Sequence, residues 1–457
     1  MAVNPNRTMT DPLFTGMEVV LAHSSPKTRH LQLGDFVILG FRALISKYDA
    51  DSEEGYESYQ EDRSGDEFDQ EEDLSGDEAN PEKDVSGAKV NVKRKKDLPG
   101  KEIDSDDEDL FDEQINFQRG LVKSLNSSLL PRLRHQITTM SLSLDPTRLQ
   151  KDPEFHLDVI LGIQSEFNQT WHEIKAALRI LCRDSSSWKT ENDRQLKELK
   201  YFRLSKLSTF IEIALWSDLF ELFEESYASI QRLKLTNEKP FVWSHRAFSS
   251  EWKSRHVCSP LKEIDSALFW SNGSDFDLVQ FDWPSRIHEI DNKLEELLNL
   301  IDAKNGNAPP NSLSKPSIQL ANSLIPIIKL IRVFFDTLVQ WGANKKRLPM
   351  FTEMHSGQLE ATSVLPQHVN RDLEALLQLL KKKPPAAEGS RRDIDFVRRA
   401  RKMQERFQRP IELILCHFTP LIPDDHGFPS RDDFTTWINS WSSQLSLATK
   451  NLKHATS

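Results

Sequence analysis

Cysteine is scarce in this sequence, and the few cysteines present are not arranged to pair. The three cysteines, Cys182, Cys258 and Cys416, lie far apart and form no CxxC motif. Their odd number and wide spacing fit neither a disulfide framework nor a pair of zinc ligands, so we expect a reducing compartment. Cys416 stands in the apolar stretch IELILCHFTPLI, which favours a core position over a nucleophilic one.

The motifs of several large enzyme classes are missing as well. The 16 glycines are scattered and form neither a GxxxxGKS/T nor a GxGxxG phosphate loop, and the chain contains no HExxH or GxSxG motif. These spacings are what phosphate binding, zinc proteolysis and serine hydrolysis require. We therefore expect a protein that is not an enzyme and that holds no cofactor.

A long uncharged apolar run is also lacking. The nearest candidate, LIPIIKLIRVFF, carries Lys329 and Arg332 and is too short to span a bilayer, so we expect no membrane partner. The opening stretch MAVNPNRTMTDPLFTGMEVV has no basic segment followed by an apolar one, and we expect no secretory signal.

Negative charge is concentrated in one segment of the chain. Acids far outnumber bases over residues 49–113, whereas the rest of the chain carries more bases than acids. This segment has few branched apolar residues, so burial cannot offset the entropy lost on ordering it, and we expect it to be disordered. Residues 1–48 contain the apolar stretch LGDFVILGFRALI. They are compatible with a docked helix or strand, with a short binding motif and with a loose terminus.

The acidic segment contains features of regulation. Lys93, Arg94, Lys95 and Lys96 form a compact basic cluster of the kind that a nuclear-import receptor binds, which favours a nuclear or cytoplasmic location. Three serines each have an acid three residues downstream, which suits an acidophilic kinase: they are Ser64, Ser75 and Ser105. Each phosphate would add about −1.5 to −2 charges.

From residue 114 onward, apolar residues recur with helical spacing. The stripes predict an all-α protein with about eight or nine helices, too many for one four-helix bundle. We expect two packed subdomains, 114–303 and 318–453, separated by the linker 304–317, with a boundary near 240–260 as the alternative. The longest stripes are Phe117, Leu121, Leu125, Leu129, Leu133 and Ile137; Leu157, Ile160, Phe167, Trp171, Ile174, Leu178 and Leu181, interrupted at Gln164; Leu324, Ile327, Ile331, Phe334, Leu338 and Trp341; and Phe434, Trp437, Trp441, Leu445, Ala448 and Leu452.

One predicted helix has a cationic face. Its bases fall within about 80° of arc on a helical wheel built at 100° per residue. The face is compatible with a solvated surface, a phosphate-bearing partner such as nucleic acid, or the acidic segment of the same chain, which phosphorylation would then hold more tightly. The residues of this cationic face are Arg391, Arg398, Lys402, Arg406 and Arg409.

A short loop gathers the residue types that bind a divalent ion. In IPDDHGFPSRDD, the side chains of Asp424, Asp425 and His426 precede Asp432 and Asp433. Ligand spacing on a regular element is missing, however. A proline-bounded turn before a helix whose first acids offset the helix dipole explains the same residues without a metal.

Three stretches resemble a known group of proteins. They are LLPRLRHQITTMSLSLDPTRLQKDP at 129–153, NKKRLPMFTEM at 344–354 and HFTPLIPDDHGFPSRDDFTTWINSWSSQLSLATKNL at 417–452. Over residues 114–453 the chain resembles an expanded family of uncharacterised helical proteins of rust-type fungi. That resemblance implies a helical body in a fungal cell and no catalytic or ligand residue. The helix pattern alone also resembles cyclin-D-interacting helical-bundle proteins.

Three functions follow as hypotheses. The first is a non-enzymatic helical interaction protein that binds a protein partner through a helix face or groove, regulated by its acidic segment. The second is a nucleic-acid or chromatin-associated protein that uses the cationic face. The third is a metal-dependent all-α enzyme built on Asp424, Asp425 and His426.

Overall fold

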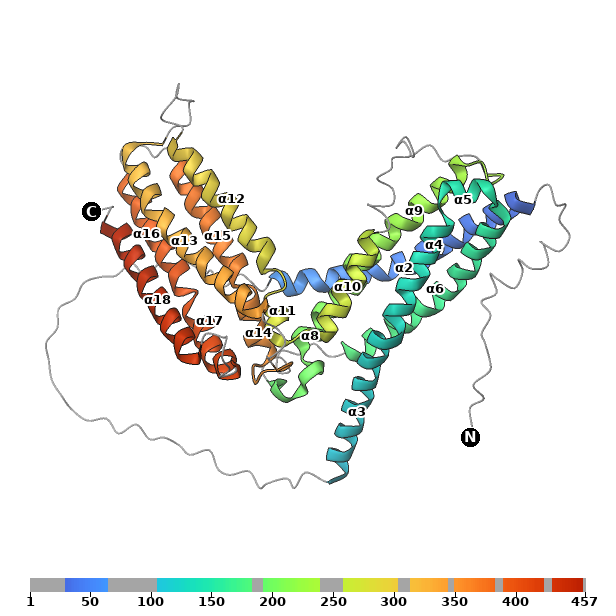
Figure 1. Cartoon of the computed structure of the whole chain (residues 1–457), viewed down its shortest axis with the longest axis horizontal. Coiled ribbons are helices and arrows are strands. Elements are labelled where there is room, and N and C mark those ends of the chain that lie inside the picture. The colour runs from blue at the N-terminus through green and yellow to red at the C-terminus, as the bar shows by residue number, and fades with distance from the viewer. Residues whose placement is uncertain are drawn as a thin grey trace. The chain divides into compact units, whose positions relative to one another are not determined.

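The computed structural model is helical throughout the part of the chain that it describes (Figure 1). That part comprises residues 29–64, 105–182, 192–238, 258–302, 313–343, 349–382, 389–422 and 430–454, with backbone alone for 49–64, 105–111, 341–343 and 389–390. Within these ranges no strand occurs, which confirms the predicted all-α class.

The chain divides into two compact units, and neither is continuous in sequence. Unit 1 comprises residues 1–121, 132–173 and 215–260, and unit 2 comprises 122–131, 174–214 and 261–457. This division differs from the expected subdomains 114–303 and 318–453. The physical reason is that the helices on either side of the linker 304–317 pack directly against each other and so share one unit.

Unit 2 contains five long helices that form a closed ring. They are α12 (Trp283–Asp302), α13 (Lys315–Ala343), α18 (Arg431–His454), α16 (Gly389–Glu405) and α15 (Leu365–Lys381). In this order each helix packs on the next, α15 packs back on α12, and α13 also reaches α15 across the ring. Each apolar stripe is therefore covered by two neighbours.

Aromatic side chains fill the centre of this ring. Phe334 of α13 has its ring centroid 4.5 Å from that of Trp441 of α18 and 5.3 Å from that of Phe407. Phe335 lies 5.2 Å from Trp283 of α12. The predicted stripe Leu324–Leu338 is fully buried in this core, because the aromatic rings of four segments converge on it.

Shorter helices join the ring to the rest of unit 2. Their bounds are α8 (Tyr201–Thr209), α10 (Cys258–Asn272), α11 (Asp275–Val279), α14 (Ser356–Ser363) and α17 (Gln408–Leu413). Two 3₁₀ segments, η2 (Arg194–Leu199) and η7 (Thr419–Leu421), and three π segments, η1 (Leu125–Leu129), η3 (Phe210–Leu215) and η6 (Ile414–Phe418), lie at the ends of these and other helices. Apolar periodicity did not resolve these short elements.

Unit 1 is built from six helices in the described residues. They are α2 (Arg29–Ser64), α3 (Ser105–Ser124), α4 (Leu130–Ser143), α5 (Pro146–Lys151), α6 (Pro153–Leu181) and α9 (Trp216–Arg232). Its core is also aromatic, with Trp171 of α6 5.4 Å from Trp216 of α9 and Phe167 5.1 Å from Phe223. One residue of the predicted stripes is misplaced, because Phe117 on α3 is 57% exposed.

The apolar stretch near the N-terminus is a core helix of unit 1. On α2, Leu33, Val37, Ile38, Phe41, Leu44 and Tyr48 are all buried. Asp35 accepts the backbone N–H of Asn237 at 2.9 Å, and Arg42 pairs with Glu238 at 2.9 Å. Of the three structures compatible with residues 1–48, the docked helix is the one adopted from residue 29 onward.

Helix also extends into both ends of the segment expected to be disordered. Residues 49–64 continue α2, and residues 105–113 open α3. At these ends the chain continues a helix that begins or ends in packed structure. Residues 65–104, which carry the rest of that prediction, lie outside the described part.

The interruption of the α6 stripe at Gln164 has a structural explanation. Gln164 is fully buried, and its Nε2 donates to the Val37 carbonyl of α2 at 2.9 Å. A Cβ added at Gly40 would lie 2.2 Å from Gln164 Oε1, so glycine is what allows α2 to approach this side chain. The polar residue in the stripe thus marks the place where α2 docks.

By length and composition, α13 alone among the described helices could cross a membrane, over Lys315–Gln340. Its most apolar residues face the ring of unit 2, where it contacts α12, α15 and α18.

The close approach of α2 gives a stability prediction. A Cβ at Gly34 would lie 1.6 Å from the Leu235 carbonyl oxygen, a backbone atom that cannot turn aside. We expect Gly34→Ala to lower the free energy of unfolding by about 1–3 kcal/mol, the cost of an overpacked contact. The measurement is urea unfolding of the full chain followed by circular dichroism.

Gly162→Ala is the matched control. Gly162 is exposed on α6 and has no neighbour within 4 Å of an added Cβ, so alanine should raise stability by roughly 0.5–1 kcal/mol through helix propensity. Equal stabilisation by both alanines would show that α2 is not docked against Leu235.

Candidate functional site

Most of the predicted regulatory residues lie at or beyond the edges of the described chain. The basic cluster Lys93–Lys96 and Ser75 lie outside the described residues. Ser64 is the last residue of α2, and Ser105 is the first residue of α3. The two serines therefore occupy opposite kinds of helix end.

The predicted cationic face lies on α16 and its continuation, but its charges are largely balanced. Arg398 pairs with Asp395 at 2.9 Å, and Arg409 pairs with Glu412 at 3.5 Å. Arg406 turns inward and donates from Nε to Asp372 of α15 at 2.6 Å. Arg391 and Lys402 remain exposed. The face is thus less cationic than a wheel of the bases alone indicates.

The predicted metal loop is only partly described. Asp424, Asp425 and His426 lie outside the described residues. Asp433 forms a reciprocal cap with Ser430: its Oδ2 accepts the Ser430 N–H at 2.9 Å, and Ser430 Oγ accepts the Asp433 N–H at 3.1 Å. These hydrogen bonds lower the pKa of Asp433. Among the residues that the structure describes, no His, Cys, Asp or Glu group suited to a metal is found.

The cysteines differ in their surroundings. Burial raises the pKa of the Cys182 thiol to about 11, which leaves it unreactive near neutral pH. Cys416 is exposed, so its interpretation as a core residue is wrong. The apolar run around it belongs to the π segment η6, which turns Cys416 outward while Ile414 and Phe418 are buried.

A buried cluster of charges is centred on Asp275, the first residue of α11. Asp275 Oδ2 accepts from Lys200 Nζ and from the Thr352 N–H, each at 2.8 Å. Its Oδ1 accepts from Arg203 Nε at 3.0 Å. Lys200 and Asp275 are fully buried and Arg203 is 2% exposed. The three charged groups therefore contact one another instead of water.

Backbone carbonyls complete the cluster. Lys200 Nζ also donates to the Thr352 carbonyl at 2.7 Å, and Arg203 Nη2 donates to the Gly273 carbonyl at 2.8 Å. Burial lowers the pKa of Arg203, and the neighbouring Asp275 opposes that shift. These contacts fasten the connection 349–355 to α8 and α11. The cluster therefore has a structural role, because each ion is held by other groups of the fold.

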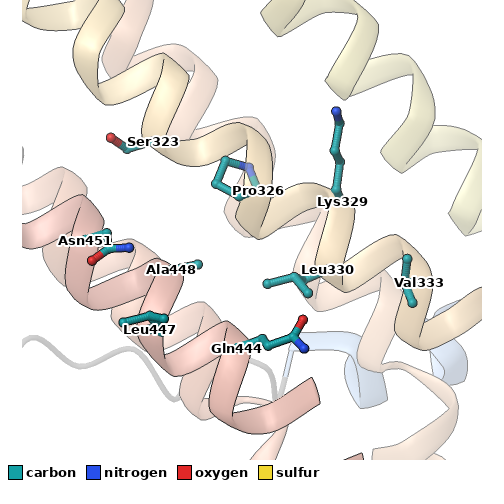
Figure 2. Close-up of a pocket in the computed structure, with 9 residues that line it drawn as sticks. All are labelled: Ser323, Pro326, Lys329, Leu330, Val333, Gln444, Leu447, Ala448 and Asn451. Carbon is teal, nitrogen blue, oxygen red and sulfur yellow. The ribbon is translucent and has the colours of Figure 1, made fainter. Parts of the chain in front are cut away.

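An open, mostly apolar groove lies between α13 and α18 (Figure 2). We call it the α13–α18 groove. Its volume is about 600 Å³, and it is lined by Ser323, Pro326, Lys329, Leu330 and Val333 of α13 and by Gln444, Leu447, Ala448 and Asn451 of α18.

The local sequence explains how the groove forms. The two helices run antiparallel, with Ser323 near Asn451 and Leu330 near Gln444 (Figure 2). Trp441 Nε1 donates to the Leu330 carbonyl at 2.7 Å, which fixes the two helices together beneath the groove. Pro326 stands inside α13, where its missing N–H leaves the Asn322 carbonyl without the usual helical donor.

The groove leaves apolar side chains in contact with water. Val333 is 47% exposed and Leu447 is 58% exposed, whereas the next residues in the chain, Phe334 and Ala448, are buried. Lys329 extends away from α18 and presents only its stem to the groove (Figure 2). Such a surface can bury apolar side chains of another molecule.

Sequence reasoning missed this groove. The helical stripes identified the buried residues of α13 and α18 but not which apolar residues remain uncovered. The available signal was the set Pro326, Leu330 and Val333, spaced at i, i+4 and i+7 beside the main stripe of α13. When one apolar row of a helix is already buried in the core, a second apolar row indicates a second contact surface.

Two family models match adjacent stretches of the chain, each over less than half of its length. Residues 118–272 match a domain of unknown function (DUF8723). Residues 274–454 match a domain of unknown function (DUF8721), which contains the α13–α18 groove. The chain matches no curated protein and no solved structure.

The matched stretches meet at Gly273, in the turn between α10 and α11, and α2 precedes both. Neither description names an activity. The resemblance to helical proteins of rust-type fungi, and that to cyclin-D-interacting proteins, stays a prediction.

The buried charges give a test of their structural role. Asp275→Asn would leave Lys200 and Arg203 buried without a counter-charge, and we expect it to cost about 3–5 kcal/mol of unfolding free energy. Urea unfolding measures this loss. The control is Glu405→Gln, which breaks the exposed Arg401–Glu405 pair at 3.0 Å and should cost no more than about 0.5 kcal/mol. A small, equal cost for both variants would mean that water reaches Asp275.

Proposed function

We propose that this protein is a non-enzymatic helical interaction protein whose α13–α18 groove receives a helix of a protein partner. The observation that carries the proposal is the pair of exposed apolar side chains, Val333 and Leu447, on facing helices of the same groove. Clustered apolar surface of this kind is costly in water and marks interaction sites more often than isolated exposed residues do.

The spacing along the groove suits a helix. Pro326, Leu330 and Val333 follow i, i+4 and i+7 on one wall, and Gln444, Leu447 and Asn451 follow i, i+3 and i+7 on the other. Seven residues of helix rise by about 10 Å, or two turns. A partner helix that lies along the groove would contact both walls. Its contacting residues would be spaced at i, i+3 or i+4, and i+7, which is the usual geometry of helix-in-groove recognition.

The acidic segment is the proposed regulatory element, and an acidophilic kinase is its proposed modifying enzyme. Ser64 ends α2 and Ser105 begins α3, so phosphates at these serines would act in opposite directions. A phosphate is repelled at a helix C-terminus and favoured at an N-terminus. Phosphorylation would therefore fray the end of α2 and strengthen the start of α3.

The basic cluster Lys93–Lys96 supports a nuclear or cytoplasmic location as part of the same proposal. Import receptors recognise short basic clusters of this kind. If the protein is imported, it would bind its partner in the nucleus.

Nucleic-acid binding is the second candidate. The exposed Arg391 on α16 favours it, because phosphate contacts are made by accessible bases. The ion pairs of Arg398, Arg406 and Arg409 weigh against it, since a phosphate would have to displace an acid already in place. We therefore rank it below the protein partner.

The groove can be tested by substitution at its exposed residues. Leu447→Asp places a charge against the partner's apolar face and should weaken binding at least about 30-fold, as loss of a central interface residue does. The side chain is exposed, so the stability of the free protein should change by no more than about 0.5 kcal/mol. Leu298→Asp, at a 40% exposed leucine on α12, is the control.

The measurement has two stages. Affinity capture from the native cell first compares the unaltered chain with the two variants. A protein lost only with Leu447→Asp is then purified, and its direct binding is measured by calorimetry. If every directly binding protein is retained equally by all three chains, the groove is not the docking surface.

Regulation by the acidic segment is tested by deleting residues 65–104, which leaves α2 and α3 whole. If the segment covers the cationic face, the shortened chain should bind heparin more tightly than the full chain at matched salt, and the gain should shrink as salt is raised. Phosphorylation of the full chain should lower heparin binding further. Equal binding by both chains argues against masking.

A further inference from the structure

The two helices that form the α13–α18 groove are poor in acids. Between Phe434 and His454, α18 contains no Asp or Glu, and α13 contains only Asp336. Arg332 lies between two acids: its Nε is 2.6 Å from Asp291 of α12 and 3.7 Å from Asp336 of its own helix. No Asp or Glu is among the residues that line the groove.

Two lysines of these helices, one in the groove lining and one beside a lining residue in sequence, have no counter-charge among the described residues. Lys329 on α13 and Lys450 on α18 are both exposed, and no described acid pairs with either of them. Lys450 directly precedes the lining residue Asn451, and Lys329 itself lines the groove.

We propose that the partner helix is acidic at its flanks: an amphipathic helix with an apolar face for the groove and Asp or Glu beside that face, placed to meet Lys329 and Lys450. This inference rests on the proposed function, because it specifies the partner of the same groove. The apolar contacts supply most of the affinity, and the flanking acids supply selection between partners and the direction of approach.

The acidic flank also excludes competitors. A helix with basic flanks would bring like charges against both lysines while its apolar face is being buried. Exposed ion pairs contribute little each, so the preference is moderate and depends on salt. The chain's own acidic segment satisfies the same charge requirement and competes in the test below if it reaches the groove.

The experiment uses three synthetic helical peptides and the full-length protein. The peptides share one apolar face and carry Glu, Gln or Lys at the flanking positions, and fluorescence anisotropy measures their affinity. We expect the Glu peptide to bind about tenfold more tightly than the Lys peptide at low salt, with the gap closing as salt is raised. Lys329→Glu combined with Lys450→Glu should reverse the order of the two peptides.

Lys262→Glu combined with Lys382→Glu, two exposed lysines outside the groove, is the charge-matched control and should leave the order unchanged. Equal affinity of all three peptides, together with loss of binding in Leu447→Asp, would overturn the acidic preference and leave the docking groove intact. Failure of every peptide to bind, both to the full chain and after deletion of 65–104, would overturn the groove as well.

Discussion

The contact between α13 and α18 is the constraint on which the functional account depends. Phe334 and Trp441 pack 4.5 Å apart at the centre of unit 2, and Trp441 Nε1 reaches the Leu330 carbonyl at 2.7 Å. The indole thereby buries its ring and satisfies its polar group within one contact. Because this contact sets the spacing of the two helices, it also determines that Val333 and Leu447 border an open groove.

Polar contacts of long sequence range complete both units. In unit 2, Asp275 joins Lys200 and Thr352, which are 75 and 77 residues away in the chain. In unit 1, Gln164 reaches α2 across 127 residues. Such buried groups are favourable only when every partner is in place, so they select one arrangement of helices from the many that would satisfy the apolar stripes.

The sequence predicted the helical class and most of the core, because the buried face of a helix carries apolar residues at regular spacing. The stripe through Leu157, Trp171 and Leu181 is buried as expected, and so is that through Phe434, Trp441 and Leu452. Docking of α2 and the charges around Asp275 could not be predicted in this way, since periodicity carries no information about which distant residue is the partner. The groove was not predicted for a different reason. It consists of apolar residues that no other helix covers, and helical periodicity identifies the covered ones.

Methyl NMR of the full-length chain, titrated with the Glu-flanked helical peptide, tests the central claim most directly. The account predicts that the methyl signals of Leu330, Val333 and Leu447 shift together and saturate at one peptide concentration. The signals of Leu298 on α12 and Leu39 on α2, both exposed outside the groove, should stay in place. Shifts confined to those outer leucines, or a peptide that binds without moving the groove methyls, would contradict it.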